Sequence, residues 1–148
     1  MTGTNQLAAS IDNLIQVNFE RMAAFDKASQ LTSDEDLKNY FENKAEESER
    51  HIEELQTVFP GGFATAQTTQ SKSFLPACKT FANAVYRKNL NVIVDSAKSV
   101  EKHMTEWYQK IAEGLSNVPS EVENILKSQL TSVKSGQVQL NTLMASFK

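Results

Sequence analysis

Residues 31–62 read LTSDEDLKNYFENKAEESERHIEELQTVFPGG, and this stretch contains one helix together with both of its boundary signals. At its start, a Thr and a Ser each stand three residues before an acid, which is the spacing of a capping box. A Pro-Gly-Gly turn ends it. The side chains that share one face at helical spacing are Leu37, Phe41, Lys44, Ser48, His51, Ile52, Leu55 and Phe59. The stretch therefore predicts an amphipathic helix over residues 34–59.

Apolar residues recur every three or four positions along most of the chain, and no stretch alternates with period two for long. Residues 60–73 are rich in Thr, Gln, Ser and Gly, which predicts a loop. A chain of 148 residues has room for one core, so we expect a single all-α domain over residues 1–148. Its expected helices lie at about 5–30, 34–59, 74–86 (a short one), 89–113 and 120–147.

The lengths of the connections indicate how these helices are arranged. Short connections near residues 31–33 and 115–118 make two antiparallel hairpins, and the long span 60–88 must carry the chain from one hairpin to the other. A plain up-down-up-down bundle does not need so long a middle connection. A four-helix bundle with one long crossover is the ferritin-like arrangement. We therefore expect a ferritin-like four-helix bundle whose crossover contains the short extra helix.

Two blocks of sequence resemble helices of the ferritin-like superfamily. DLKNYFENKAEESERHIEEL, residues 36–55, resembles the second helix of such bundles, and VEKHMTEWY, residues 100–108, is similar to the third. The closest likeness is to a class of small bacterial four-helix-bundle proteins, over roughly residues 10–145. It depends on helix order and length and on the positions of Glu47, Glu101 and Tyr108. The resemblance implies the fold but supplies no activity, because that class has none assigned.

Ferritin-like di-metal centres need a Glu from each of two helices and a Glu-x-x-His motif from each of the other two. Carboxylates neutralise and bridge the two cations, and neutral imidazoles complete the coordination. The second predicted helix offers Ser48 where a motif ending at His51 needs its acid, with Glu47 close by. The third offers Glu101. The candidate metal ligands are therefore Glu47, His51 and Glu101.

The first and last helices supply no further ligands. The inward positions expected in the middle of the first helix are Asn18 and Met22, and the last helix has no acid and no histidine after Glu123. Because the set is incomplete, the main interpretation assigns no metal, no cofactor and no catalytic residue. The alternative is a di-iron or di-manganese protein, of the oxidase or metal-storage type, with a remodelled site.

In the main interpretation, the polar residues of the interior form a buried polar layer of Asn18, Ser48, Glu101 and Gln137. Counting from the hairpin turns places Asn18 level with Ser48, and Glu101 near Gln137. Buried polar groups need partners, so we expect these side chains to hydrogen-bond each other or an ordered water.

The charge pattern and the motifs exclude several classes of function. Residues 1–59 carry twelve acids and five bases (net −7), and residues 60–148 carry six acids and ten bases (net +4). Only Arg87 and Lys88 are contiguous bases, so we expect no nucleic-acid partner. The sequence contains no apolar run of the ~18 residues that a membrane span needs and no secretory signal, so we expect a cytoplasmic protein without a membrane partner. Phosphate-loop, nucleophile-elbow and zinc-protease motifs are absent, and the single cysteine, Cys78, is expected to pack.

Two segments carry unusually few charges. Residues 1–19 contain only Asp12, and the last helix after Glu123 carries only Lys127, Lys134 and Lys148. Low charge is typical of contact surfaces, because burying charges costs desolvation. We therefore expect a non-enzymatic bundle that acts through protein–protein contacts, as a homodimer or with another protein.

Overall fold

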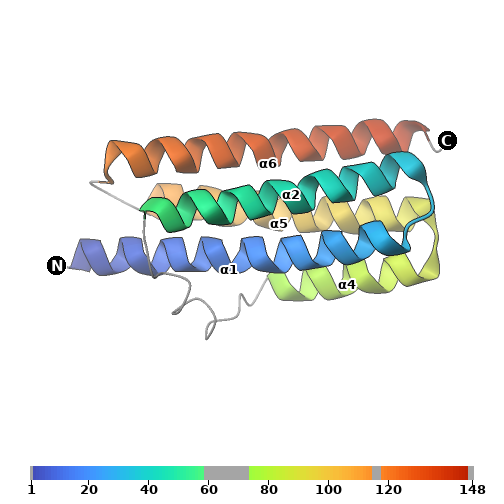
Figure 1. Ribbon diagram of the computed structural model, residues 1–148, viewed down its shortest axis with the longest axis horizontal. Coiled ribbons are helices and arrows are strands. Elements are labelled where there is room, and N and C mark those ends of the chain that lie inside the picture. Colours follow the sequence, from blue (N-terminus) through green and yellow to red (C-terminus); the bar gives the residue numbers. More distant parts are fainter. Residues whose placement is uncertain (1, 59–73, 115–117, 147–148) are drawn as a thin grey trace.

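The computed structural model describes residues 2–58, 74–114 and 118–146. Within them every element of regular secondary structure is an α-helix, which confirms the all-α prediction. The helices are α1 (Thr2–Leu31), α2 (Glu35–Val58), α4 (Phe74–Arg87), α5 (Leu90–Gly114) and α6 (Ser120–Ser146) (Figure 1). α1 starts three residues before the expected position, and the other described bounds lie within one residue of expectation. The loop expected at residues 60–73 and the expected helix ends at residues 59 and 147 lie outside the described residues.

The four long helices α1, α2, α5 and α6 lie side by side around the hydrophobic core (Figure 1). α1 packs on α2 and α5, and α6 packs on α2 and α5. The chain direction is the same in α1 and α6, and it is reversed in α2 and α5. Neighbouring long helices are therefore antiparallel, and α2 and α5 run the same way, as a single long crossover between two hairpins requires. α4 lies outside this group, against α1 and α5.

The helix caps differ in detail from the expected ones. The backbone N–H of Leu37 donates to Asp34 Oδ2 at 3.0 Å, so Asp34 caps α2. The capping boxes predicted from Thr32 and Ser33 are therefore wrong. Asp34 can replace them because its carboxylate reaches the same free N–H groups one residue later.

The turn between α4 and α5 is set by two adjacent residues. Lys88 has a φ of 58°, in the left-handed region, and this conformation ends α4. Asn89 then caps α5, because its Oδ1 accepts from the backbone N–H of Val92 at 3.2 Å. The two residues therefore separate α4 from α5, near the boundary expected between helices 74–86 and 89–113.

An aromatic cluster attaches α4 to the first hairpin. The ring of Phe81 lies edge-on to Phe25 of α1 (5.3 Å between centroids) and to Phe41 of α2 (5.2 Å). Phe25 and Phe41 stack on each other at 5.4 Å. All three side chains are fully buried. Aromatic pairs of this kind contribute about 0.5–1.5 kcal/mol each beyond the area they bury, so the cluster holds the short helix in place.

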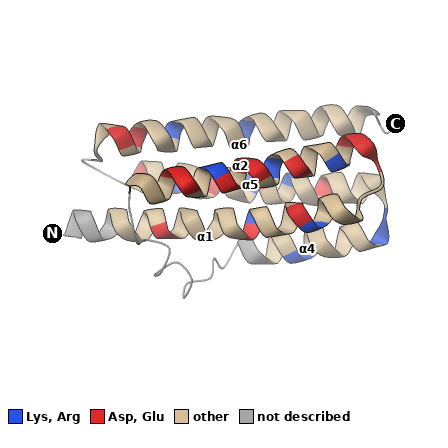
Figure 2. Cartoon of the chain, in the orientation of Figure 1, with Lys and Arg blue, Asp and Glu red and all other residues tan. Residues whose placement is uncertain are grey.

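Charged residues are unevenly distributed over the helices (Figure 2). α2 carries many charges of both signs, whereas α6 carries only Lys127 and Lys134 beyond Glu123 up to residue 146. None of the described helices combines the length and the apolar character needed to cross a membrane.

Candidate functional site

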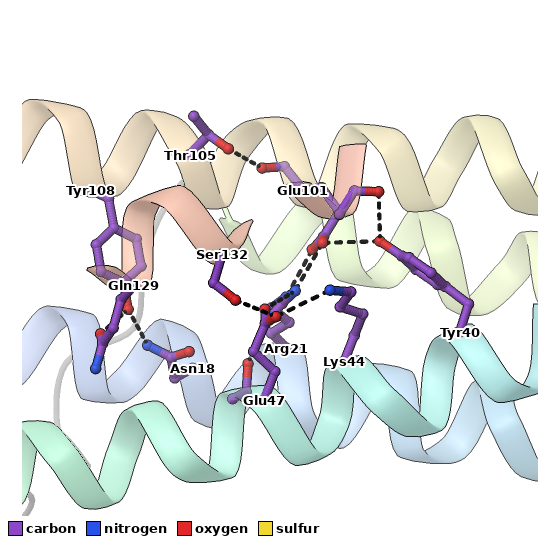
Figure 3. A network of polar contacts seen from close by, with 12 residues as sticks. Asn18, Arg21, Tyr40, Lys44, Glu47, Glu101, Thr105, Tyr108, Gln129 and Ser132 are labelled. Atoms are coloured by element: carbon purple, nitrogen blue, oxygen red, sulfur yellow. Dashed lines mark hydrogen bonds and ion pairs between the residues drawn. The ribbon is translucent and has the colours of Figure 1, made fainter. Parts of the chain in front are cut away.

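The centre of the bundle holds a fully buried arginine (Figure 3). Arg21 lies three residues after Asn18 and four before Phe25, so helical spacing turns it inward. Its Nε and Nη2 donate to Glu101 Oε1 and Oε2 of α5 at 2.7 and 2.8 Å. This is a bidentate guanidinium–carboxylate pair, the strongest geometry for such a contact. Phe25 packs against the guanidinium, with 5.4 Å from Cζ to the ring centroid.

The same guanidinium also reaches α2. Its Nη2 forms an ion pair with Glu47 Oε1 at 2.9 Å, and its Nη1 donates to Ser48 Oγ at 2.8 Å. Arg21 therefore lies between the carboxylates of Glu47 and Glu101 and connects α1, α2 and α5 (Figure 3).

A second cation completes the charge balance. Lys44 Nζ lies 3.0 Å from Glu47 Oε2, and the same oxygen accepts from Ser132 Oγ of α6 at 2.6 Å. Lys44 and Glu47 are both buried. The charged side chains of this group are Arg21, Lys44, Glu47 and Glu101, two positive and two negative, so their formal charges sum to zero. We call these four residues the ion network.

Tyr40 and Gly136 close one end of the ion network. The hydroxyl of Tyr40 lies 3.1 Å from Glu101 Oε2 and 3.2 Å from the backbone oxygen of Gly136, and it donates to them. A Cβ atom on Gly136 would stand 2.6 Å from Glu101 Oε2. Only a residue without a side chain therefore lets α6 approach Glu101 so closely.

The pKa values show how the charges stabilise each other. Burial alone would lower the pKa of Arg21, but Glu101 and Glu47 outweigh it and raise this pKa above its usual value. Burial alone would raise the pKa of Glu47, but Arg21 and the hydrogen bond from Ser132 lower it to about 2. Both groups are therefore charged at neutral pH. Burial, followed by the charge of Glu101, raises the pKa of Tyr40, which stays a neutral donor.

A second hydrogen-bond chain lies beside the ion network (Figure 3). The hydroxyl of Tyr108 donates to Gln129 Oε1 at 2.5 Å and accepts from Asn18 Nδ2 at 3.0 Å. Gln129 Nε2 donates to the backbone oxygen of His51 at 3.2 Å and to Glu54 Oε1 at 2.9 Å. Burial raises the pKa of Tyr108, so this hydroxyl keeps its proton.

His51 is buried beside this chain, with its ring 6.4 Å from that of Tyr108. Its Nδ1 has no hydrogen-bond partner among residues 2–58, 74–114 and 118–146. Burial lowers the pKa of His51 to about 4, so the imidazole is neutral at physiological pH.

The structure brings the candidate metal ligands into the interior but puts a protein cation among them. Glu47, His51 and Glu101 are all buried. Arg21 takes up both oxygens of Glu101 and one of Glu47, and Lys44 takes the other oxygen of Glu47. In the described part of the chain, no three His, Cys, Asp or Glu side chains are grouped so as to hold a metal ion.

The residues expected in a buried polar layer have these positions. Asn18, Ser48 and Glu101 are fully buried, and Gln137 is half-buried. Asn18 bonds Tyr108 rather than Ser48, which accepts instead from Arg21. The residues of α6 that reach the interior groups are Gln129, Ser132 and Gly136.

Arg21 is the central residue that the sequence pattern did not identify. The sequence predicts Met22 as the inward residue at this level, because an apolar residue fits a core position better than a charged one. In the structure Met22 is half-buried. A signal was present, since positions 14, 18, 21 and 25 continue the inward spacing through Arg21. Two acids expected in an apolar interior also call for a cation.

A scan against protein-family models, a search of curated proteins and a search of solved structures each returned no match for this chain.

Proposed function

We propose that this protein is a ferritin-like four-helix bundle that works without a metal and acts through protein contacts, with a second copy of itself as the partner. The observation that carries the proposal is the position of Arg21 between Glu47 and Glu101. In a ferritin-like bundle, inward carboxylates from facing helices neutralise a pair of metal ions. Here the guanidinium and Lys44 neutralise the carboxylates instead.

Electrostatics makes the two occupants mutually exclusive. A divalent cation placed near Glu47 and Glu101 would lie within a few ångströms of Arg21 and Lys44. Like charges at such distances in a low-dielectric interior repel each other by several kcal/mol. Both carboxylate oxygens of Glu101 already accept strong hydrogen bonds from Arg21, which a metal would have to break.

The topology supports the ferritin-like part of the proposal. The first and last long helices run one way and the middle two run the other (Figure 1). Glu47 of α2 and Glu101 of α5 share the cation of Arg21 at the centre of the bundle, where ferritin-like proteins bind metal.

The contact surface that we assign to the dimer lies on α6 and the neighbouring part of α2. Val138 is 66% exposed, and it lines a shallow depression of about 430 Å³ between these helices. Its neighbours in the depression are mostly uncharged, among them Ser135, Gln139 and Thr142. A twofold interface places the same patch on both partners, so a patch with little charge avoids like-charge repulsion.

The test combines metal analysis with sedimentation. The full chain, purified from cells grown with ample iron and manganese, should contain far less than one metal ion per chain by mass spectrometry. It should also sediment as a dimer at micromolar concentration. Two ions per chain, with the absorption of an oxo-bridged iron pair, would contradict the metal-free part and favour the alternative site built on Glu47, His51 and Glu101. A strict monomer at high concentration would contradict the dimer.

A further inference from the structure

A second feature of the molecule lies outside the four-helix interior. An open groove of about 230 Å³ runs between α1 and α4. It exists because small side chains face each other across the two helices: Ala23, Ala24 and Ala28 on α1, and Ala82 on α4. Side chains this short leave the space between the helices unfilled. Ala28, Cys78 and Val85 are buried and form the floor.

The walls of the groove are apolar. Leu31 and Tyr86 line it where α1 and α4 end, and they are 41% and 61% exposed. Burial raises the pKa of the Cys78 thiol to about 12, so this side chain adds no charge to the floor. An exposed apolar groove of this kind is typical of a binding surface.

Two lysines give the groove a definite sign of charge. Lys27 of α1 and Lys79 of α4 line it and are exposed, and none of the described residues that line it is acidic. Among the described residues, neither lysine forms an ion pair. The groove therefore offers two unneutralised cations beside a hydrocarbon surface.

We propose that this groove binds a single-chain aliphatic carboxylate, with the hydrocarbon chain between α1 and α4 and the carboxylate at Lys27 and Lys79. From Ala23 to Leu31, α1 rises about 12 Å. An extended chain advances about 1.2 Å per single bond, so a saturated chain of about ten carbons matches this length.

The size and charge of the groove distinguish this ligand from other occupants. A partner helix is about 10 Å across and needs much more room than 230 Å³. A cationic amphiphile would bring its charge against Lys27 and Lys79. An aliphatic carboxylate suits both features, because its hydrocarbon chain packs on the apolar walls and its charge pairs with the lysines.

The experiment titrates the full chain with decanoate below its micelle concentration and measures binding by calorimetry. Decyltrimethylammonium, which has the same chain and the opposite charge, is the comparison ligand. We expect saturable binding of one decanoate per chain and no saturable binding of the cation. Absence of saturable decanoate binding, or equal binding of both amphiphiles, would overturn the proposal.

Variants of the lining residues test the place of binding. Lys27→Glu/Lys79→Glu should weaken decanoate binding by at least about tenfold, because two attractive charges become repulsive. Ala82→Leu should weaken it to a similar extent by filling the groove, and it suits an exposed helical position. Lys134→Glu, on α6, is the matched control and should leave the affinity unchanged. If the groove variants bind decanoate like the parent protein, the proposed ligand is wrong. If Ala82→Leu changes the oligomeric state instead, the proposed ligand is also wrong, and another copy of the chain occupies the groove.

Discussion

Arg21 keeps a full positive charge out of contact with water. Taking a charge out of water costs several kcal/mol, and the pairing with Glu101 and Glu47 offsets this cost. The ion pairs add little net stability to the fold, but the buried carboxylates cannot do without them. Once two carboxylates are buried in the interior, the cation between them is needed for the folded state.

Replacing Arg21 with methionine should therefore be strongly destabilising. Arg21→Met keeps an unbranched side chain but leaves Glu47 and Glu101 without their shared cation. We expect the free energy of unfolding to fall by about 3–5 kcal/mol, measured by urea denaturation at pH 7.

The control for this variant is Lys102→Met, which removes an exposed cation from α5 and should change stability by no more than about 0.5 kcal/mol. The double variant Arg21→Met/Glu101→Gln should recover part of the loss, because it also removes one uncompensated charge. A loss for Arg21→Met as small as that of the control would show that the carboxylates do not depend on this guanidinium.

Gly136 gives a second prediction at the same scale. Alanine is the better helix former by about 1 kcal/mol, so Gly136→Ala should stabilise an unconstrained helix. In this bundle the new Cβ would stand 2.6 Å from Glu101 Oε2 and 3.0 Å from the Tyr40 hydroxyl. We therefore expect the melting temperature to decrease.

Gly114→Ala is the matched comparison, because a Cβ there meets nothing within 4 Å. It should leave the melting temperature unchanged or raise it slightly. Equal effects of the two substitutions would mean that α6 can move away from Glu101 at little cost.

Acid should weaken the fold in two pH ranges. Burial lowers the pKa of His51 from 6.5 to about 4, so between these values the unfolded chain takes up a proton that the folded chain does not. The free energy of unfolding therefore decreases as the pH falls from 6.5 to about 4, and the contribution of His51 to this decrease is on the order of 3 kcal/mol. Glu47, with its pKa lowered from 4.5 to about 2, adds a further loss between those two values.

The measurement is the free energy of unfolding between pH 7 and pH 4. His51→Gln should flatten the decline in this range, because glutamine does not titrate. His103→Gln removes the other histidine and should keep the decline of the parent protein. A decline that is equally steep in His51→Gln would show that another group takes up the proton.

At the scale of helices, the sequence predicts most of what the structure contains. Apolar spacing located the helix bounds because each helix buries a continuous face. The sequence predicts the cap of α2 at Thr32 and Ser33, whereas Asp34 provides it, because several adjacent residues are suitable cap formers and only the geometry selects one. The partners of Glu101 were not predictable in this way. Arg21 lies 80 residues before Glu101 in the sequence. Gly136 rather than Gln137 lies against Glu101, because the packing of the helices sets how α6 is aligned with α5 and the local sequence pattern does not.

The stability of α4 depends on the packing of one side chain more than on the length of the helix. A helix of 14 residues is marginal alone, so Phe81, in contact with Phe25 and Phe41, should supply much of its anchoring. Phe81→Ala should cost about 3–5 kcal/mol and should speed hydrogen exchange in α4 more than in α2.

Tyr86→Ala is the control on the same helix, because this side chain is 61% exposed. It should change stability by no more than about 0.5 kcal/mol. If Phe81→Ala accelerates exchange equally in all helices, α4 unfolds only together with the bundle.

At the scale of the whole molecule, the proposed dimer gives the prediction to test. Val138→Lys puts a charge, and its twofold copy, into the middle of the proposed interface, so it should shift the sedimentation of the protein toward the monomer. Val92→Lys, at a valine of α5 that is 40% exposed, is the matched control and should leave the dimer intact. Dissociation by both variants, or by neither, would exclude α6 as the specific contact surface.

The network around Arg21 also restricts how the two hairpins can come together. It takes Arg21 from α1, Glu47 from α2, Glu101 from α5 and Ser132 from α6, so it forms only when all four long helices meet in one alignment. If one hairpin were shifted by one helical turn relative to the other, a carboxylate would be buried among apolar side chains without its cation. Mutual recognition of the halves is therefore built into the interior, and we expect misassembled forms to be rejected during folding before they can accumulate.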